Sequence, residues 1–285
     1  MRHHDKFSAL VDWIKELHVV KEENGLIRNI VDQKIAEALK CCKLFFKVWL
    51  SIFLLSLICA LASISTRYIY IFLPNFEADS NYITYQLLQA FFLSYAVVWT
   101  CCADASLVFI GIYILFFMKI INAMIKNLDS AESKENRSDL LIQIVKKHVK
   151  LLEILNMFND AIAIISLIQL VMSTIIFLSL FFAFQVYKEF FMYTIIPTMM
   201  IQLALLCIFG EMIRTENENI FQNLYQTNWY EFSVKEQKIV LLMMMNSCNE
   251  IGLKAAGMYD ISLVTLVQIT KLSFSYSAII LTFYK

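Results

Sequence analysis

Five long apolar runs dominate this chain and restrict the folds open to it. They lie at 44–70, 83–118, 161–187, 190–210 and 261–283. About 20 apolar helical residues cross a bilayer core, and each run meets or approaches that length. In lipid a helix satisfies its backbone groups within one segment, whereas a single strand cannot. The runs therefore predict an all-α membrane protein, a bundle of five transmembrane helices.

The composition agrees with a membrane protein and excludes several other classes. Hydrophobic residues make up 59% of the chain and charged residues 17%, against about 25% charged in ordinary soluble domains. A formal net charge of zero argues against nucleic acid as a partner. The sequence contains no phosphate-binding or hydrolase motif, and its four histidines are scattered. We expect neither an enzyme nor a metal or cofactor site.

Lysine and arginine are unevenly distributed among the segments that join the runs. They are frequent before the first run, after the second and after the fourth. The segments after the first and third runs offer only Arg67 and Lys188. Basic loops stay in the cytosol, so the N-terminus is predicted to be cytosolic. Five crossings then place the C-terminus outside the cell, in a multi-pass protein of the plasma membrane.

Helical periodicity continues outside the membrane runs. Residues 1–43 are predicted to be a cytosolic amphipathic segment, broken at Asn24-Gly25, and 44–285 the transmembrane domain. Apolar stripes also follow the second run and precede the third and fifth runs. Cytosolic helices with apolar stripes must bury them, so we expect a packed helical anchor beneath the membrane.

The fifth run carries a repeated polar face. Its members recur at spacings of three and four: Thr265, Gln268, Lys271 or Leu272, Ser275, Ile279 and Thr282. Polar groups within a span must face protein or water. One interpretation is a helix–helix seam, where small hydroxyl residues allow close approach. The other is the wall of a water-filled pore, which Lys271 favours because Asp104 is the only acid within the spans.

Two further features of the spans have alternative explanations. Asp104 either pairs with Lys271 or accepts hydrogen bonds from a polar ligand. Aromatic and thioether side chains are frequent in the outer halves of the spans, and most suit lipid contact and an interfacial belt. A minority would suit an apolar pocket for a small lipophilic ligand. The candidates for that pocket are Tyr68, Phe92, Tyr95, Trp99, Tyr193 and Met200.

Several motifs, in order along the chain, resemble those of the insect odorant receptor family. They are Leu73-Pro74 with Tyr85-Gln86, Cys207-Ile-Phe-Gly-Glu211, Glu216-Asn217, Leu224-Tyr225, Trp229-Tyr230, and the tail Ala256–Leu263 followed by Ser275-Tyr276. Asn217 stands where the family usually has Ser, and Asn223 where it usually has Ala. The resemblance implies a seven-span receptor with a cytosolic N-terminus. The five runs would then be its third to seventh spans, with the first two missing.

The resemblance also implies a function. Members are subunits of heterotetrameric cation channels, gated by small volatile ligands and formed with a shared odorant coreceptor. The last span of the family lines the pore, which places Leu281 at the hydrophobic gate and Thr282 on a polar ring outside it. Gln268 and Ser275 would lie along the same wall.

Other functions are less compatible with the sequence. A gustatory receptor would end in a Thr-Tyr…Gln-Phe pattern, which this chain lacks. A transporter unrelated to chemosensation would show paired spans broken by Gly or Pro, whereas only Gly111 and Pro197 interrupt these. A G-protein-coupled receptor would place its N-terminus outside the cell, against the distribution of lysine and arginine.

Overall fold

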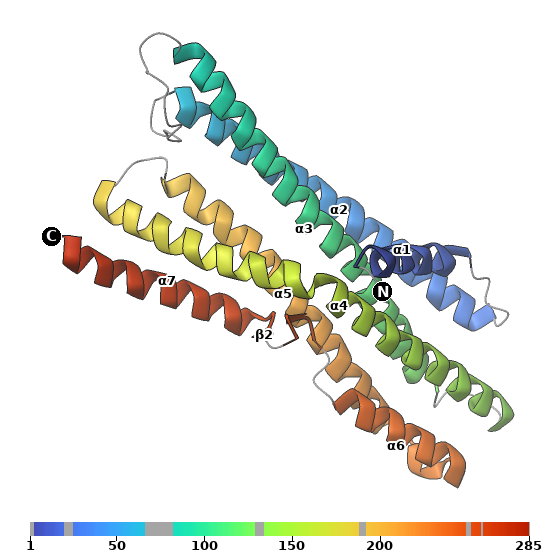
Figure 1. The fold of residues 1–285 in the computed structure, drawn as a ribbon. Coiled ribbons are helices and arrows are strands. Elements are labelled where there is room, and N and C mark those ends of the chain that lie inside the picture. The colour runs from blue at the N-terminus through green and yellow to red at the C-terminus, as the bar shows by residue number, and fades with distance from the viewer. Residues whose placement is uncertain are drawn as a thin grey trace. The chain divides into compact units, whose positions relative to one another are not determined.

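A computed structural model describes residues 3–19, 25–65, 82–128, 134–187, 192–248, 252–257 and 259–284. Within them the chain is helical except for one small hairpin (Figure 1). The helices are α1 (His3–Val19), α2 (Gly25–Ser65), α3 (Tyr82–Lys126), α4 (Lys134–Tyr187), α5 (Met192–Gln226), the short 3-10 helix η1 (Trp229–Glu231), α6 (Val234–Cys248) and α7 (Leu263–Tyr284). The strands β1 (Lys254–Ala255) and β2 (Tyr259–Asp260) pair antiparallel. The predicted all-α membrane fold is confirmed.

The long helices follow from long stretches of sequence without helix breakers. Helix α4 extends over 54 residues without a single Gly or Pro, and α3 over 45 residues with Gly111 alone. The helices are longer than the apolar runs, because α4 begins at Lys134 and the run at 161. Pro197 lies inside α5, one to two turns from its start. Charged residues therefore extend the same helices beyond the apolar runs.

Three stretches of the described helices are long and apolar enough to cross a membrane. They are Ala105–Lys126 of α3, Arg137–Val186 of α4 and Leu263–Phe283 of α7. The predicted spans 44–70 and 190–210 include residues outside the described part of the chain. Protein covers 78% of the α3 window but only 11% of the α7 window. The apolar residues of Ala105–Lys126 thus serve a protein core, whereas few residues of the α7 window are buried.

The chain divides into two compact units, each made of segments distant in sequence. The first comprises Met1–Cys42, Val108–Val171 and Leu205–Val267. Its centre is a heptad row on α4, buried at Leu141, Ile144, His148, Leu151, Leu155, Phe158 and Ile162. Helix α1 joins this unit through Trp13, whose ring meets Phe117 edge-on at 5.5 Å, and through a 2.7 Å ion pair between Lys6 and Asp160.

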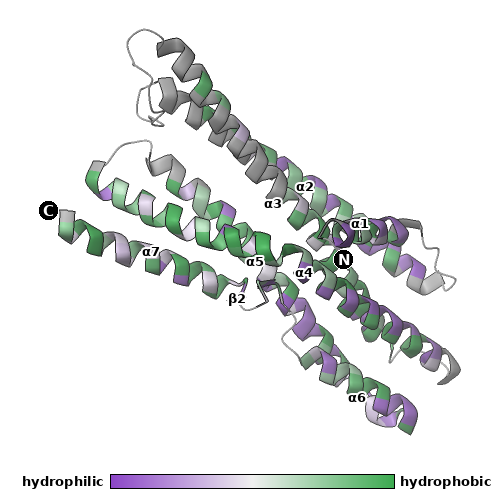
Figure 2. Cartoon of the chain, viewed as in Figure 1, coloured by the Kyte–Doolittle hydropathy of each residue, from purple (hydrophilic) through white to green (hydrophobic). Residues whose placement is uncertain are grey.

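The second unit comprises Lys43–Leu107, Met172–Ala204 and Gln268–Lys285. Phe177 of α4 is fully buried there, and Phe181 meets Phe274 of α7 edge-on at 5.9 Å. Hydrophilic residues gather on α1, on the first half of α4 and on α6, whereas α7 and the second half of α4 are mostly hydrophobic (Figure 2). Within α4, the hydrophilic residues are thus concentrated in the first half and the hydrophobic residues in the second (Figure 2).

Candidate pore helix and its hairpin seat

Helix α7 presents two faces of different chemistry. On one face Ser273 and Ser277 are fully buried, and Ser273 Oγ donates to the backbone carbonyl of Thr174 on α4 at 3.4 Å. Thr270 Oγ1 lies 3.8 Å from Met200 Sδ of α5 on the same side. Small hydroxyl residues let helices approach closely, so this face is the helix–helix seam.

The opposite face is polar and uncovered. Gln268, Lys271, Ser275 and Thr282 are all exposed, and at 100° per residue they lie across the helix from Ser273. Thr282 Oγ1 donates to the carbonyl of Ile279 at 2.6 Å, and Leu281 beside it is half-buried. Within this chain the helix–helix seam of α7 is therefore formed by residues outside the predicted polar stripe. The seam is made by residues 270, 273 and 277, whereas the stripe that includes Gln268 and Ser275 faces away from the protein.

Thr265 has a different role from the other stripe positions. Its Oγ1 donates to the carbonyl of Asp260 at 2.6 Å and lies 3.4 Å from Ser262 Oγ. Ser262 immediately precedes α7, at the position where Ser most often caps a helix. Thr265 is thus half-buried and bound to the segment just before the helix, in contrast to the exposed positions of the stripe.

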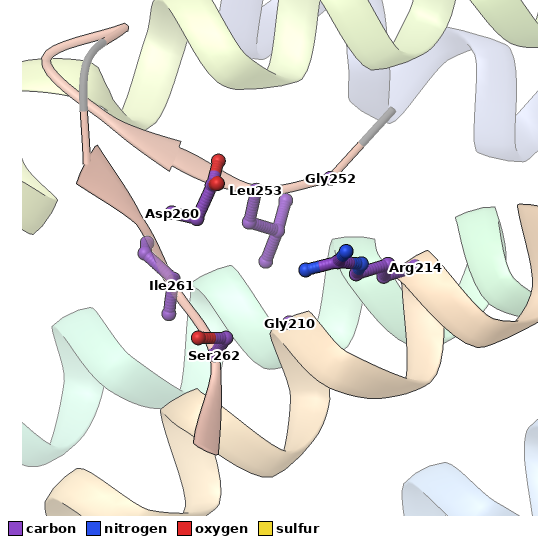
Figure 3. Close-up of a pocket in the computed structure, with 7 residues that line it drawn as sticks. All are labelled: Gly210, Arg214, Gly252, Leu253, Asp260, Ile261 and Ser262. Atoms are coloured by element: carbon purple, nitrogen blue, oxygen red, sulfur yellow. The ribbon is translucent and has the colours of Figure 1, made fainter. Parts of the chain in front are cut away.

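The β1–β2 hairpin packs against α5 and α4 and leads directly into the start of α7. This packing contact of the hairpin is the seat of α7. Figure 3 shows Leu253, Asp260 and Ile261 of the hairpin segment beside Gly210 and Arg214 of α5. The α5 helix has no side chain at Gly210, and a Cβ there would overlap the carbonyl oxygen of Ile261. The cavity left between these residues holds about 20 Å³, room for a single water molecule. It is too small for an odorant.

Helix α4 holds the other side of the hairpin by three hydrogen bonds. Asn159 Nδ2 donates to the carbonyl of Gly252 at 3.1 Å, and its Oδ1 accepts from the backbone N–H of Lys254 at 3.3 Å. The backbone N–H of Ala256, which has a φ of 52°, donates to the carbonyl of Ala163 at 3.0 Å. Left-handed backbone is uncommon at Ala, so this bond helps to hold the turn.

Sequence reasoning found one part of this seat and missed another. Two of the motifs that suggested the family, Cys207–Glu211 and Ala256–Leu263, meet at the contact of Gly210 with Ile261. Asn159 was not identified as a site residue. The only available signal was a polar residue two positions before an apolar run, and its partners lie over 90 positions away.

Two polar clusters connect the helices of the first unit. Asn122 of α3 donates to the Oε2 of Glu216 at 3.0 Å and accepts from Asn223 Nδ2 at 2.9 Å. Asn217 of α5 donates to the carbonyl of Ser247, whose hydroxyl lies 3.2 Å from His148 Nε2. The two residues that depart from the family pattern, Asn217 and Asn223, therefore both form hydrogen bonds between helices.

The predicted ligand residues are only partly described. Tyr68 lies outside the described residues, and the structure does not describe the side chains of Phe92, Trp99 and Tyr193. Tyr95 of α3 is exposed, and Met200 meets Thr270 as above. Asp104 also lies at a position of α3 whose side chain is not described. The roles of the six candidate ligand residues, and that of Asp104, therefore remain predictions.

The fold, with its long apolar helices, defines a multi-pass helical membrane protein. Two structures of the olfactory receptor OR5 of Machilis hrabei superpose on the chain with a TM-score of 0.79 each. One of them is a complex with eugenol; it is 13% identical, and the match covers 97% of this chain and 74% of the OR5 chain. The other is 14% identical, and the match covers 98% of this chain and 74% of the OR5 chain.

Sequence comparison gives the family. The 7tm Odorant receptor model matches residues 1–274, and the chain belongs to this family. Odorant receptor 67c of Drosophila melanogaster is 26% identical over 64% of this chain and 46% of the relative. Odorant receptor 85b of the same species is 23% identical over 60% of this chain and 45% of the relative. The matches thus span just under half the length of these relatives. The recognition of an insect odorant receptor is confirmed.

Proposed function

We propose that this chain is a receptor subunit that binds small volatile molecules and opens a cation channel together with the odorant coreceptor. The observation that carries the proposal is the uncovered polar face of α7. A helix in lipid does not expose Gln268, Lys271 and Ser275 to acyl chains, because charged and polar groups there are costly. Water in a pore shared among subunits satisfies them. Leu281 and Thr282 would form the gate and the polar ring at the outer end of this pore.

A second surface supports assembly with other subunits. On α6, Leu241, Leu242 and Met245 are 52%, 59% and 60% exposed, while Val240 and Met244 are buried. Helix α6 also carries Lys235 and Lys238, and the distribution of basic residues predicts that this segment is cytosolic. An apolar face in a cytosolic position suits a protein partner rather than lipid. In the heterotetramer this face would contact a neighbouring subunit.

The same proposal fixes the placement of the chain in the plasma membrane. Residues 1–43 would be cytosolic, 44–285 would form the transmembrane domain, and the C-terminus would be extracellular. Volatile ligands would bind among the outer aromatic and thioether residues, including Tyr95 and Met200. The eugenol complex of the Machilis receptor supports a small aromatic alcohol as one class to test.

Co-expression with the coreceptor tests the function directly. Voltage-clamped cells that carry both chains should pass cation current when a panel of volatiles is applied. Cells with the coreceptor alone provide the baseline for each volatile. A chain that reaches the surface with the coreceptor, yet changes neither the size nor the odorant profile of the current, would contradict the proposal.

Two serines of α7 provide a matched test of the pore. Ser275 is exposed on the polar face and Ser277 is fully buried in the seam. In co-expressing cells, a water-soluble cationic thiol reagent should reduce the current of Ser275→Cys rapidly. Ser277→Cys should respond no faster than the unsubstituted chain, whose own thiols define the background. Equal rates for the two variants would remove this face from the pore.

A further inference from the structure

A hollow of about 240 Å³ in the first unit is lined by residues of four helices, and we call it the α1–α4 hollow. Its apolar walls come from α1, α2 and α3, and they consist of Trp13, Leu17, Val31, Phe117 and Ile120. All of these side chains are buried except Leu17, which is half-buried. Ligand pockets have mainly apolar and aromatic walls, and a drug-sized ligand needs about 300–1,000 Å³. The hollow therefore suits a ligand that is somewhat smaller.

The remaining side of the α1–α4 hollow is cationic, because α4 contributes Lys146, Lys147 and Lys150 to it. Lys150 Nζ lies 3.0 Å from Glu153 Oε2, so this charge is already paired. Lys146 is exposed and forms no hydrogen bond or ion pair within the described part of the chain. Among the described lining residues, Glu16 of α1 is the only acid. The lining thus carries more positive than negative charge.

A second hollow of the same unit has a similar volume, about 270 Å³, and the opposite charge. It is lined by the apolar Ile208, Met212 and Leu263 together with Thr215, Glu211 and Glu216. Neither lysine nor arginine is among those of its lining residues that the structure describes. Volume and apolar walls are therefore common to both hollows. Charge is the property that distinguishes the ligands that each of them can take.

We propose that the α1–α4 hollow binds a small amphiphilic anion, a medium-chain aliphatic carboxylate. The alkyl chain would lie against Trp13 and Phe117, where its removal from water favours binding. The carboxylate would accept a charge-assisted hydrogen bond from Lys146 Nζ. A single negative charge suits the site better than a doubly charged phosphate, because Glu16 repels further negative charge and Lys150 is already paired.

The proposed carboxylate site is separate from the predicted odorant pocket. Tyr95 and Met200 of that pocket belong to the second unit, whereas every described residue of the α1–α4 hollow belongs to the first. The site depends neither on the pore nor on the placement of the chain in the membrane. Because α1, α2, α3 and α4 all line the hollow, a bound carboxylate would link the N-terminal helices to the rest of the first unit.

Photoaffinity labelling of the purified full chain in nanodiscs tests the proposal. The probe is decanoate with a diazirine on its alkyl chain, and mass spectrometry identifies the labelled peptides. We expect label on peptides that contain Trp13 or Phe117, and none on the peptide that contains Met212 of the acidic hollow. Unlabelled decanoate should compete with the probe. Decanol and decyltrimethylammonium lack the negative charge and should compete at least about tenfold more weakly.

Four variants measure the contribution of charge and of volume to the Kd of decanoate. Lys146→Gln should raise the Kd about tenfold, because it removes one charge-assisted hydrogen bond. Glu16→Gln should lower the Kd about two- to fivefold, because it removes a repulsive charge at an exposed position. Leu17→Trp should abolish labelling by filling the hollow. Lys126→Gln is the matched control, since Lys126 is an exposed lysine that is not among the lining residues.

Several results would overturn the carboxylate site. They are a chain without label, decanol that competes as well as decanoate, and equal Kd values for Lys146→Gln and Lys126→Gln. Equal label on the peptide with Met212 would mean adventitious partition of an amphiphile only. A chain that carries odorant-evoked current with the coreceptor and binds no decanoate contradicts this inference alone. A chain that binds decanoate and leaves the current of the coreceptor unchanged contradicts the proposed function alone.

Discussion

Gly210 of α5 lies so close to Ile261 that a Cβ at position 210 would overlap the Ile261 carbonyl oxygen and lie 3.0 Å from its carbon. Ile261 follows strand β2, and α7 begins two residues later. The glycine therefore allows the hairpin to seat directly on α5. The position of the first turn of α7 depends on this contact, since these residues continue directly from the hairpin.

The substitution Gly210→Ala should destabilise the protein and disturb gating. Alanine is the better helix former by about 1 kcal/mol, but overpacking against backbone costs about 1–3 kcal/mol. Backbone cannot rotate away as a flexible side chain can, so the overlap should outweigh the gain. Thermal unfolding in detergent or nanodiscs should show a lower Tm. Gly252→Ala is the control, because a Cβ there meets nothing within 4 Å. Equal Tm values for the two variants would contradict the prediction.

Asn159 provides a graded test of the same seat. Asn159→Ala removes both of its bonds to the hairpin, whereas Asn159→Asp keeps an oxygen to accept from Lys254 and loses the donor to Gly252. A part-buried group left unpaired costs about 1–3 kcal/mol. At equal surface expression, we expect the odorant-evoked current to be largest for the unsubstituted chain, smaller for Asn159→Asp and smallest for Asn159→Ala. If Asn159→Ala gives the same odorant-evoked current as the unsubstituted chain, the bonds from α4 are not needed to position the start of α7.

The helices were predictable because their signal is local. Long segments without Gly or Pro, such as those of α3 and α4, have few alternatives to a helix. The extent of membrane contact was harder to predict. Apolar residues suit lipid and protein core equally, so the sequence could not distinguish the buried Ala105–Lys126 from the uncovered Leu263–Phe283.

The candidate pore face was predictable and its seat was not. Gln268, Ser275 and Thr282 share a face of one helix, so spacing alone brings them together. The bonds of Asn159 to Gly252 and of Asn217 to Ser247 join positions far apart in sequence. A periodic pattern in the sequence does not reveal which distant residues form such pairs. The apolar stripe predicted before the fifth run is only partly buried, because Val240 and Met244 of α6 are buried whereas Leu241 and Met245 are exposed.

Leu281 is the proposed gate, so its replacement by a small polar residue should raise the basal current. A ring of large apolar side chains closes a pore by excluding water, and a hydroxyl in its place allows the pore to stay wet. We expect Leu281→Ser to conduct without odorant in voltage-clamped cells. Leu272→Ser is the control, since position 272 is on the same helix about 13 Å away at helical rise. A basal current raised equally by both would remove Leu281 as the gate.

The start of α6 should be sensitive to acid through Glu236. Ser233 donates to Glu236 Oε2 from its hydroxyl at 2.7 Å and from its backbone N–H at 2.9 Å. These hydrogen bonds, and to a lesser degree Arg137, hold the pKa of Glu236 below its ordinary value. A depressed pKa in the folded state means that stability is present above the ordinary pKa. It is lost as pH falls through the depressed value.

Hydrogen exchange at the first turn of α6 measures this effect. Protection should fall as the pH is lowered through the acid range, after correction for the intrinsic exchange rate. Glu236→Gln should show lower protection at neutral pH and a flatter dependence on pH. The same acid dependence in both proteins would exclude Glu236 as its source.

The Asn122–Asn223 pair should show coupling between α3 and α5. Asn223 Nδ2 donates to Asn122 Oδ1, and Asn122 donates in turn to Glu216. Removing either asparagine leaves polar groups without their partner at a part-buried site, so each single Ala substitution should cost about 1–3 kcal/mol. Removing both leaves fewer orphaned groups, and the double variant should be less destabilised than the sum by about 0.5–3 kcal/mol. Unfolding midpoints of the four proteins in one double-mutant cycle measure this coupling. Strictly additive costs would mean that the bond joins the two helices without stabilising them.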